Sequence, residues 1–328
     1  MALNGPEAPR WGDFAGRCLA SACSANADLF LPDGQALGLV KTASYLLGTW
    51  RTADGEMHRF LRGIQPFQSP HGCYVFSTRG ATHLARQSEQ EAQTYRGGIS
   101  TRAEGDTVRF APVNGRGFSH RINADKAEWA EDGLLHASGV RSAQATQWYN
   151  PWRDGGGAFC VTTKFRGQAN IFGLAAEGFF AHEVHYFPRD RDFINSPFGF
   201  GGREIVWGHM ATEFVDGRII DASIGIGADG WGFALVQDEQ GVLHAATDVS
   251  AEAIVNANGL PAQVTFRFLD QTWVWRIEPK GERAITRADG LVGAEGVLRR
   301  EGDTRPVKAA MGTIDWWLDG RAAAIIKR

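Results

Sequence analysis

Groups suited to proton transfer are concentrated between residues 178 and 214. This stretch holds three of the nine histidines, an alternating run of arginine and aspartate at 189–192, and many aromatic side chains. Polar groups that are buried among aromatic rings cost free energy unless they form hydrogen bonds or take part in chemistry. We therefore expect the functional site here, on two strands joined by a loop beside an apolar cavity.

Alternation along the first of these strands, residues 178–187, divides its side chains into two sets. His182 and Tyr186 share one face with Phe180, whereas Glu183 and His185 share the opposite face. The strand therefore presents an imidazole and a phenol to one side, and a carboxylate and an imidazole to the other.

The second strand places Trp207 and His209 on one face. If His182, Tyr186 and His209 all point inward, the cavity contains two acid/base groups and a hydroxyl donor. In this interpretation His182 or His209 exchanges a proton with an alkene or alcohol, and Tyr186 holds a substrate oxygen. The alternative is that each histidine is a neutral, hydrogen-bonded part of the core.

Carboxyl groups beside the histidines would orient or supply the proton. Glu183, Asp190 and Asp192 are the candidates, and burial of either aspartate would raise its pKa toward that of a proton donor. The alternative for the arginine–aspartate run is a solvated loop of ion pairs. The predicted catalytic residues are His182, Glu183, Tyr186, Asp192 and His209.

Aromatic side chains would line the substrate cavity and stabilise positive charge through their rings. The alternative is that the same side chains form an ordinary apolar core. The residues predicted to contact the substrate are Trp148, Tyr149, Phe180, His185, Trp207, Trp273 and Trp275.

The sequence predicts neither a metal site nor a cofactor. The segment from His182 to His185 is one residue short of the HExxH motif, and on a strand its two histidines face opposite sides. The glycine-rich segment 199–202 is not followed by a predicted helix that could bind a phosphate. A serine hydrolase is not indicated, because the sequence contains no GxSxG motif.

From residue 45 onward the chain has the pattern of β-strands, with turn signals at the spacing typical of antiparallel sandwiches and barrels. Hairpins are predicted at the Asp-Gly pairs 54–55, 132–133 and 216–217. The segment 150–157 contains a proline and three glycines, which predicts a linker between domains 1–155 and 156–328. We expect an all-β protein with two antiparallel barrels in tandem.

Composition limits the kinds of partner. A hydrophobic content of 43% predicts a folded chain, and the formal net charge of -3 argues against nucleic-acid binding. No apolar run reaches the length of a membrane span. The four cysteines lack zinc-like spacing and are expected to be reduced thiols, so the protein is predicted to be cytoplasmic. A homodimer is compatible with these features.

Residues 167–171, followed by 178–190, resemble the corresponding segments of AttH and carotenoid 1,2-hydratase-like proteins, which contain tandem lipocalin-like β-barrels. Val184 stands where the family has a histidine, so the resemblance implies that His182 or His185 takes over its role. It also implies two lipocalin-like barrels and a cofactor-independent reaction on a bulky hydrophobic substrate.

The leading hypothesis is therefore a cofactor-independent lyase or isomerase that hydrates, dehydrates or cyclises a terpenoid, steroid or aromatic compound. A second hypothesis is a non-catalytic carrier of a hydrophobic small molecule, because barrels enclose ligands without doing chemistry. A third is a metal-dependent enzyme.

Overall fold

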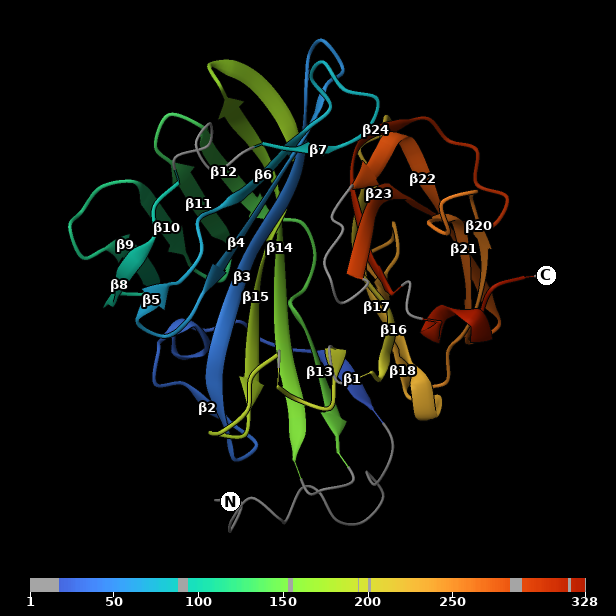
Figure 1. The fold of residues 1–328 in the computed structure, drawn as a ribbon, viewed down its shortest axis with the longest axis horizontal. Helices are drawn as coiled ribbons and strands as arrows, with labels where there is room; N and C mark the ends of the chain where they lie inside the picture. Colours follow the sequence, from blue (N-terminus) through green and yellow to red (C-terminus); the bar gives the residue numbers. More distant parts are fainter. Residues whose placement is uncertain are drawn as a thin grey trace.

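The computed structural model describes residues 18–87, 94–152, 156–193, 195–199, 202–283, 291–317 and 320–327. These residues form two curled antiparallel sheets that lie side by side (Figure 1). Within the described ranges the helical segments are short 3-10 turns, and none is long and apolar enough to cross a membrane. The predicted all-β class, with two antiparallel units, is confirmed.

The first sheet contains fifteen strands in the order β5-β8-β9-β10-β11-β12-β14-β15-β3-β4-β6-β7, with β13 beside β14, β1 beside β13 and β2 beside β3. Its strands are β1 (Leu19–Ala22), β2 (Gln35–Ala36), β3 (Leu39–Thr52), β4 (Met57–Ile64), β5 (Gln68–Ser69), β6 (Tyr74–Ser77), β7 (Ala85–Arg86), β8 (Gly97–Glu104), β9 (Thr107–Pro112), β10 (Phe118–Ile122), β11 (Lys126–Glu131), β12 (Leu135–Arg141), β13 (Thr146–Pro151), β14 (Gly157–Ile171) and β15 (Leu174–Phe187).

The second sheet contains nine strands in the order β19-β18-β17-β16-β24-β23-β22-β21-β20. Its strands are β16 (Glu204–Phe214), β17 (Ile219–Gly227), β18 (Gly232–Gln237), β19 (Leu243–Ala246), β20 (Ser250–Val255), β21 (Pro261–Phe268), β22 (Gln271–Arg283), β23 (Leu291–Arg300) and β24 (Val307–Trp317). The 3-10 turns are η1 (Ala27–Phe30), η3 (Ala228–Gly230) and η4 (Arg321–Ala324).

Asp-Gly pairs close three hairpins, as the sequence predicts. They connect β3 to β4, β11 to β12, and β16 to β17. Gly55, Gly133 and Gly217 each have a positive φ, between 73° and 85°, which glycine adopts without steric cost.

The change of sheet does not fall at the predicted domain boundary. β13 and β14 pair across the segment 150–157, with Pro151 opposite Gly157, and both strands belong to the first sheet. The first sheet extends to Phe187 and the second begins at Glu204, whereas the division into domains 1–155 and 156–328 stays a prediction. The proline and glycines mark a hairpin here, because the same residue types suit tight turns and linkers alike.

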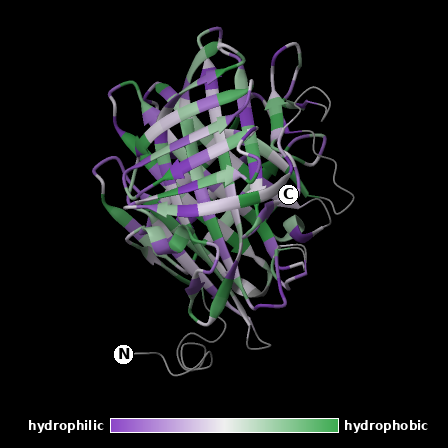
Figure 2. Ribbon diagram, turned by 90° about the vertical axis from the view of Figure 1, so that its left-hand side faces the viewer, coloured by the Kyte–Doolittle hydropathy of each residue, from purple (hydrophilic) through white to green (hydrophobic). Residues whose placement is uncertain are grey.

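Each sheet curls around its own apolar interior, and the two sheets also pack against each other. On β15, Phe180 and Val184 belong to the interior of the first sheet, whereas Phe179 and Ala181 pack against Met311 and its neighbours in the second. The strands are accordingly banded with hydrophilic and hydrophobic residues (Figure 2). A strand buried on both faces thus carries one set of side chains to the barrel interior and the other to the inter-sheet face.

Candidate active site between the two sheets

Glu183 lies at the centre of a buried polar cluster between the sheets. Its Oε1 atom is 3.0 Å from Nε2 of His209 on β16, and its Oε2 atom is 3.3 Å from Nε2 of His185. The exposed fractions of these three residues do not exceed 4%. The cluster forms because β15 turns Glu183 and His185 away from the first sheet's interior, toward the second sheet.

The carboxyl group of Glu183 is ionised. Burial alone would raise its pKa, but the imidazoles of His209 and His185 outweigh burial and hold that pKa well below its usual range. A buried carboxylate between two imidazoles can accept a proton from either ring or stabilise either ring in its charged form.

His209 has two competing partners at one nitrogen. Its Nε2 atom accepts a hydrogen bond from Nε1 of Trp207 at 2.9 Å, yet it also lies 3.0 Å from the Glu183 carboxylate. A lone pair at Nε2 satisfies the indole, and a proton at Nε2 satisfies the carboxylate, so neither state satisfies both. Nδ1 lies 3.3 Å from the hydroxyl oxygen of Ser223, which orients the ring. The Trp207 indole and the Glu183 carboxylate thus compete for Nε2 of His209.

Cys160 on β14 completes the cluster. Its thiol donates a hydrogen bond to Oε1 of Glu183 at 3.1 Å and lies 4.0 Å from Nε2 of His185. Burial raises the thiol pKa well above its ordinary value, and the Glu183 charge raises it further, so Cys160 is protonated at neutral pH. In this state it serves as a hydrogen-bond donor.

The same side chains include the donor types that zinc prefers. One ligand atom from each of Cys160, Glu183 and His185 lies within 4.8 Å of the other two. A divalent ion there would have to displace the thiol proton. The sequence offered no hint of this set, because residue 160 is far from the histidines along the chain and becomes their neighbour only through the register of β14 and β15.

Aromatic rings form a wall beside the cluster. The ring centroids of Trp148 and Trp207 are 4.9 Å apart, and those of Trp148 and Phe233 are 5.4 Å apart. Phe198 packs on Trp231 at 5.0 Å. We call these five residues the aromatic wall; it joins strands of both sheets, and the Trp207 ring lies 5.5 Å from the His209 ring in an edge-on arrangement.

His182 and Tyr186 lie on the opposite face of β15, inside the first sheet. Nδ1 of His182 is 3.1 Å from Nε2 of His120, and the Tyr186 hydroxyl donates to the Leu29 carbonyl oxygen at 3.0 Å. The structure therefore separates them from Glu183 and His209, as strand alternation predicts. The inward convergence of His182, Tyr186 and His209 on one cavity is not observed.

The remaining predicted residues are divided among several places. Phe180 and Tyr149 belong to the interior of the first sheet, and Trp273 and Trp275 to the interior of the second. Asp192 forms reciprocal hydrogen bonds with Asn195 in the loop after β15, at 2.8 and 2.9 Å. Of the residues predicted to contact the substrate, Trp148, Trp207 and His185 lie with the Glu183–His209 pair.

Sequence reasoning missed Glu204, the first residue of β16. It is 2% exposed and accepts a hydrogen bond from Nε1 of Trp317 at 3.1 Å. Burial raises its pKa to about 8, and the charges of Asp315 and Glu183 add to this effect. The inter-sheet face thus carries an ionised carboxylate and a neutral carboxylic acid, a division typical of acid/base sites.

The Glu204→Gln variant is expected to become more stable than the wild type as pH rises. Because the folded-state pKa lies above the ordinary value of 4.5, the contribution of this group is complete below pH 4.5 and is lost as pH rises through about 8. The wild type should lose about 1.4 kcal/mol per pH unit in that interval, whereas the glutamine variant should not. Urea unfolding at pH 5, 7 and 9 measures the difference, and a difference that stays constant would contradict the assignment.

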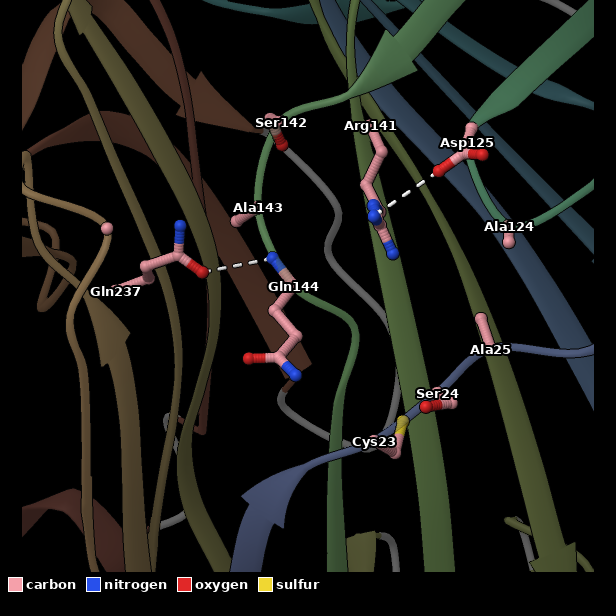
Figure 3. Close-up of a pocket in the computed structure, with 11 residues that line it drawn as sticks. Cys23, Ser24, Ala25, Ala124, Asp125, Arg141, Ser142, Ala143, Gln144 and Gln237 are labelled. Atoms are coloured by element: carbon pink, nitrogen blue, oxygen red, sulfur yellow. Dashed lines mark hydrogen bonds and ion pairs between the residues drawn. The ribbon is translucent and has the colours of Figure 1, made fainter.

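A separate pocket of about 610 Å³ lies elsewhere between the sheets (Figure 3). The Oε1 atom of Gln237 accepts a hydrogen bond from the backbone N–H of Gln144 at 3.0 Å, and Arg141 pairs with Asp125 at 3.3 Å. None of the predicted catalytic residues lines this pocket, and its charged groups are paired with each other. It is therefore not where the acid/base groups converge.

No family model matches the chain, and no curated protein matches it. Solved structures do resemble it. A putative AttH from Nitrosomonas europaea has a TM-score of 0.46 and 16% identity over 83% of this chain and 90% of that one. Kievitone hydratase from Nectria haematococca has a TM-score of 0.45 and 10% identity over 90% and 93% of the two chains. CghA, crystallised with Sch210972, has a TM-score of 0.48 and 9% identity over 96% and 98%.

An AttH-type structure is thus found among the similar structures, as the sequence resemblance implied. At these identities and TM-scores the likeness concerns the path of the chain and carries no conclusion about its reaction.

Proposed function

We propose that this protein is a cofactor-independent lyase or isomerase that acts by acid/base chemistry on a bulky hydrophobic compound. The observation that carries the proposal is the buried Glu183 carboxylate, held between His209 and His185 at 3.0 and 3.3 Å beside the aromatic wall. Buried titratable groups with strongly shifted pKa values are costly to maintain, and they are concentrated at catalytic sites.

In the proposed mechanism His209 exchanges the proton. When its ring is charged, the Glu183 carboxylate stabilises it, and the Nε2 proton can pass to an alkene or to a leaving hydroxyl group. The indole rings of Trp207 and Trp148 stabilise the resulting cation. Loss of a proton back to Nε2 gives an isomer or an alkene, and addition of water gives an alcohol.

Glu204 would act as a second proton carrier on the same side of β16. Its neutral carboxyl group can donate a proton near pH 7, where the Glu183 carboxylate cannot. A bulky substrate could contact both Glu204 and His209. One group could then protonate one carbon while the other group deprotonates another.

Two other functions compete with this proposal. The donor set of Cys160, Glu183 and His185 favours a metal-dependent enzyme. A carrier of a hydrophobic molecule would use the aromatic wall alone and would leave its ligand unchanged.

Native mass spectrometry of the freshly purified protein, followed by denaturing extraction and elemental analysis, tests the three functions together. The proposal expects an apolar molecule, or a product of one, without stoichiometric metal. Turnover of that molecule should be lost in His209→Gln and kept in His58→Gln, a buried histidine on β4 remote from the cluster. Stoichiometric metal would support the metalloenzyme instead, and binding without product in the wild type would support the carrier.

A further inference from the structure

Lys41 on β3 is a buried amine without a carboxylate partner. Its side chain is 5% exposed, and its Nζ donates to the Phe30 carbonyl oxygen at 2.6 Å. No ion pair of Lys41 occurs among the residues that the structure describes. Lys164, the other buried lysine, pairs with Asp221 at 2.5 Å and also donates to Ala222 and Ser223. Both lysines are therefore buried, but of the two it is Lys164 whose charge is balanced by a carboxylate.

Aromatic side chains surround Lys41, and the Asp33 carboxylate acts on its amine without forming an ion pair among the described residues. Its Nζ lies 5.5 Å from the ring centroid of Phe110, and the His182 ring packs on Phe30 at 5.0 Å and on Phe110 at 5.5 Å. Burial lowers the pKa of His120 to about 3 and that of His182 well below its usual range, so both rings are neutral. The amine therefore faces neutral rings, of which Phe110 lies at cation–π distance, and its charge is not balanced by an ion pair with any described residue.

The histidine pair leaves one nitrogen unused. Nδ1 of His120 donates to the Glu128 carbonyl oxygen at 2.9 Å, so its Nε2 carries a lone pair and accepts from Nδ1 of His182 at 3.1 Å. The remaining nitrogen of His182, Nε2, is a buried acceptor with no hydrogen-bond partner among the described residues. A buried acceptor of this kind fits a ligand or a water molecule that brings a donor.

The end of the first sheet above Lys41 is closed by η1. Tyr186 is opposite Lys41 in register, and its hydroxyl and the amine donate to the successive carbonyl groups of Leu29 and Phe30. Two side-chain hydrogen bonds thus hold this four-residue turn over the amine.

We propose that Lys41 is a carbonyl-reactive amine that forms an imine with an apolar aldehyde inside the first sheet. The amine nitrogen attacks the carbonyl carbon, and a C–N bond forms while the carbonyl oxygen becomes a hydroxyl group. The hydroxyl then leaves as water with one proton from nitrogen, so no oxidant or reductant is needed. The unpartnered Nε2 of His182 is an acceptor for the hydroxyl group of the intermediate, and the rings of Phe30 and Phe110 suit an apolar chain.

The chemical state of Lys41 supports this assignment. Burial lowers its pKa to about 7, although the charge of Asp33 opposes the effect. About half of the Lys41 amines are therefore neutral at pH 7, whereas an exposed lysine at its reference pKa has roughly a thousandth of its amines neutral or less. Only the neutral amine attacks a carbonyl group.

Reductive labelling with octanal and cyanoborohydride at pH 7, followed by peptide mapping, tests the proposal. The chain has six lysines, and four of them (Lys126, Lys280, Lys308 and Lys327) are exposed. We expect Lys41 to be labelled at least about tenfold faster than each of these and than ion-paired Lys164. Lys41→Met should lose this fast labelling and Lys126→Met should keep it, while the α-amino group is mapped on a separate peptide.

The rate at Lys41 should rise between pH 6 and 8 with a midpoint near 7. Asp33, His120, His182 and Tyr186 face the amine, and burial shifts the pKa of both imidazoles and of the phenol out of that interval. Labelling of Lys41 no faster than that of Lys126 in the wild type, or fast labelling that persists in Lys41→Met, would overturn the proposal. Because Lys41 and Glu183 lie on opposite sides of the first sheet, neither result bears on the proposed lyase or isomerase.

Discussion

The Glu295→Gln variant is expected to lose about 3–5 kcal/mol of stability, because it leaves the buried Arg59 guanidinium without its counterion. Glu295 on β23 is fully buried and lies 2.9 Å from Nη1 of Arg59 on β4, in the other sheet. It also accepts hydrogen bonds from Thr313 at 2.7 Å and from Thr49 at 3.0 Å. Burial lowers the pKa of Arg59 to about 10 although the Glu295 charge opposes this effect, so the guanidinium is charged at neutral pH and Glu295 is its buried counterion.

Equilibrium unfolding in urea measures this loss. Glu252→Gln is the matched control, because Glu252 pairs with Arg267 at 3.1 Å but both side chains are nearly half exposed. An exposed pair contributes at most about 1 kcal/mol. Replacing Arg59 and Glu295 together with apolar residues should recover most of the loss, since it removes both charges. A loss below about 1 kcal/mol in Glu295→Gln would mean that water reaches this part of the inter-sheet face.

Local features of the fold could be predicted from the sequence. Alternation correctly separates His182 from Glu183, because the period of a strand is a property of its own backbone. The Asp-Gly hairpins were predictable for the same reason. The change of sheet between Phe187 and Glu204 was not, because a segment such as the one with Pro151 and three glycines has the same local chemistry whether it turns within a sheet or leaves it.

The composition of the candidate site depends on long-range pairing. Cys160 faces His185 only because of the register between β14 and β15, and His209 faces Glu183 only because β16 packs across from β15. The sequence of one strand does not by itself specify which strand packs beside it. For that reason the prediction grouped His182 and Tyr186 with Glu183 and His209, from which the structure separates them, and did not include Glu204.

The Glu183→Gln variant is expected to lower turnover of the extracted substrate by about 10²–10⁴-fold, the usual contribution of a positioned proton-transfer group. The amide keeps the size of the carboxyl group, and it can still hydrogen-bond to His209. It cannot, however, stabilise a charged imidazole, because the ionised state that the two histidines enforce is gone. The loss should appear in kcat, since the negative charge acts on the protonated form of His209 and not on the apolar substrate.

Glu213→Gln is the matched control for this variant. Glu213 is buried as well, on β16, but its ion-pair partners among the described residues are Arg166 and Lys308. The Glu213→Gln variant should therefore keep its kcat within about threefold of the wild-type value, even where the loss of its ion pairs lowers stability. If both variants lost turnover equally, packing of the two sheets and not the Glu183 charge would control the reaction. If Glu183→Gln retained full turnover while His209→Gln did not, the imidazole would exchange its proton without a carboxylate, and Glu183 would only hold Cys160 and His185 in place.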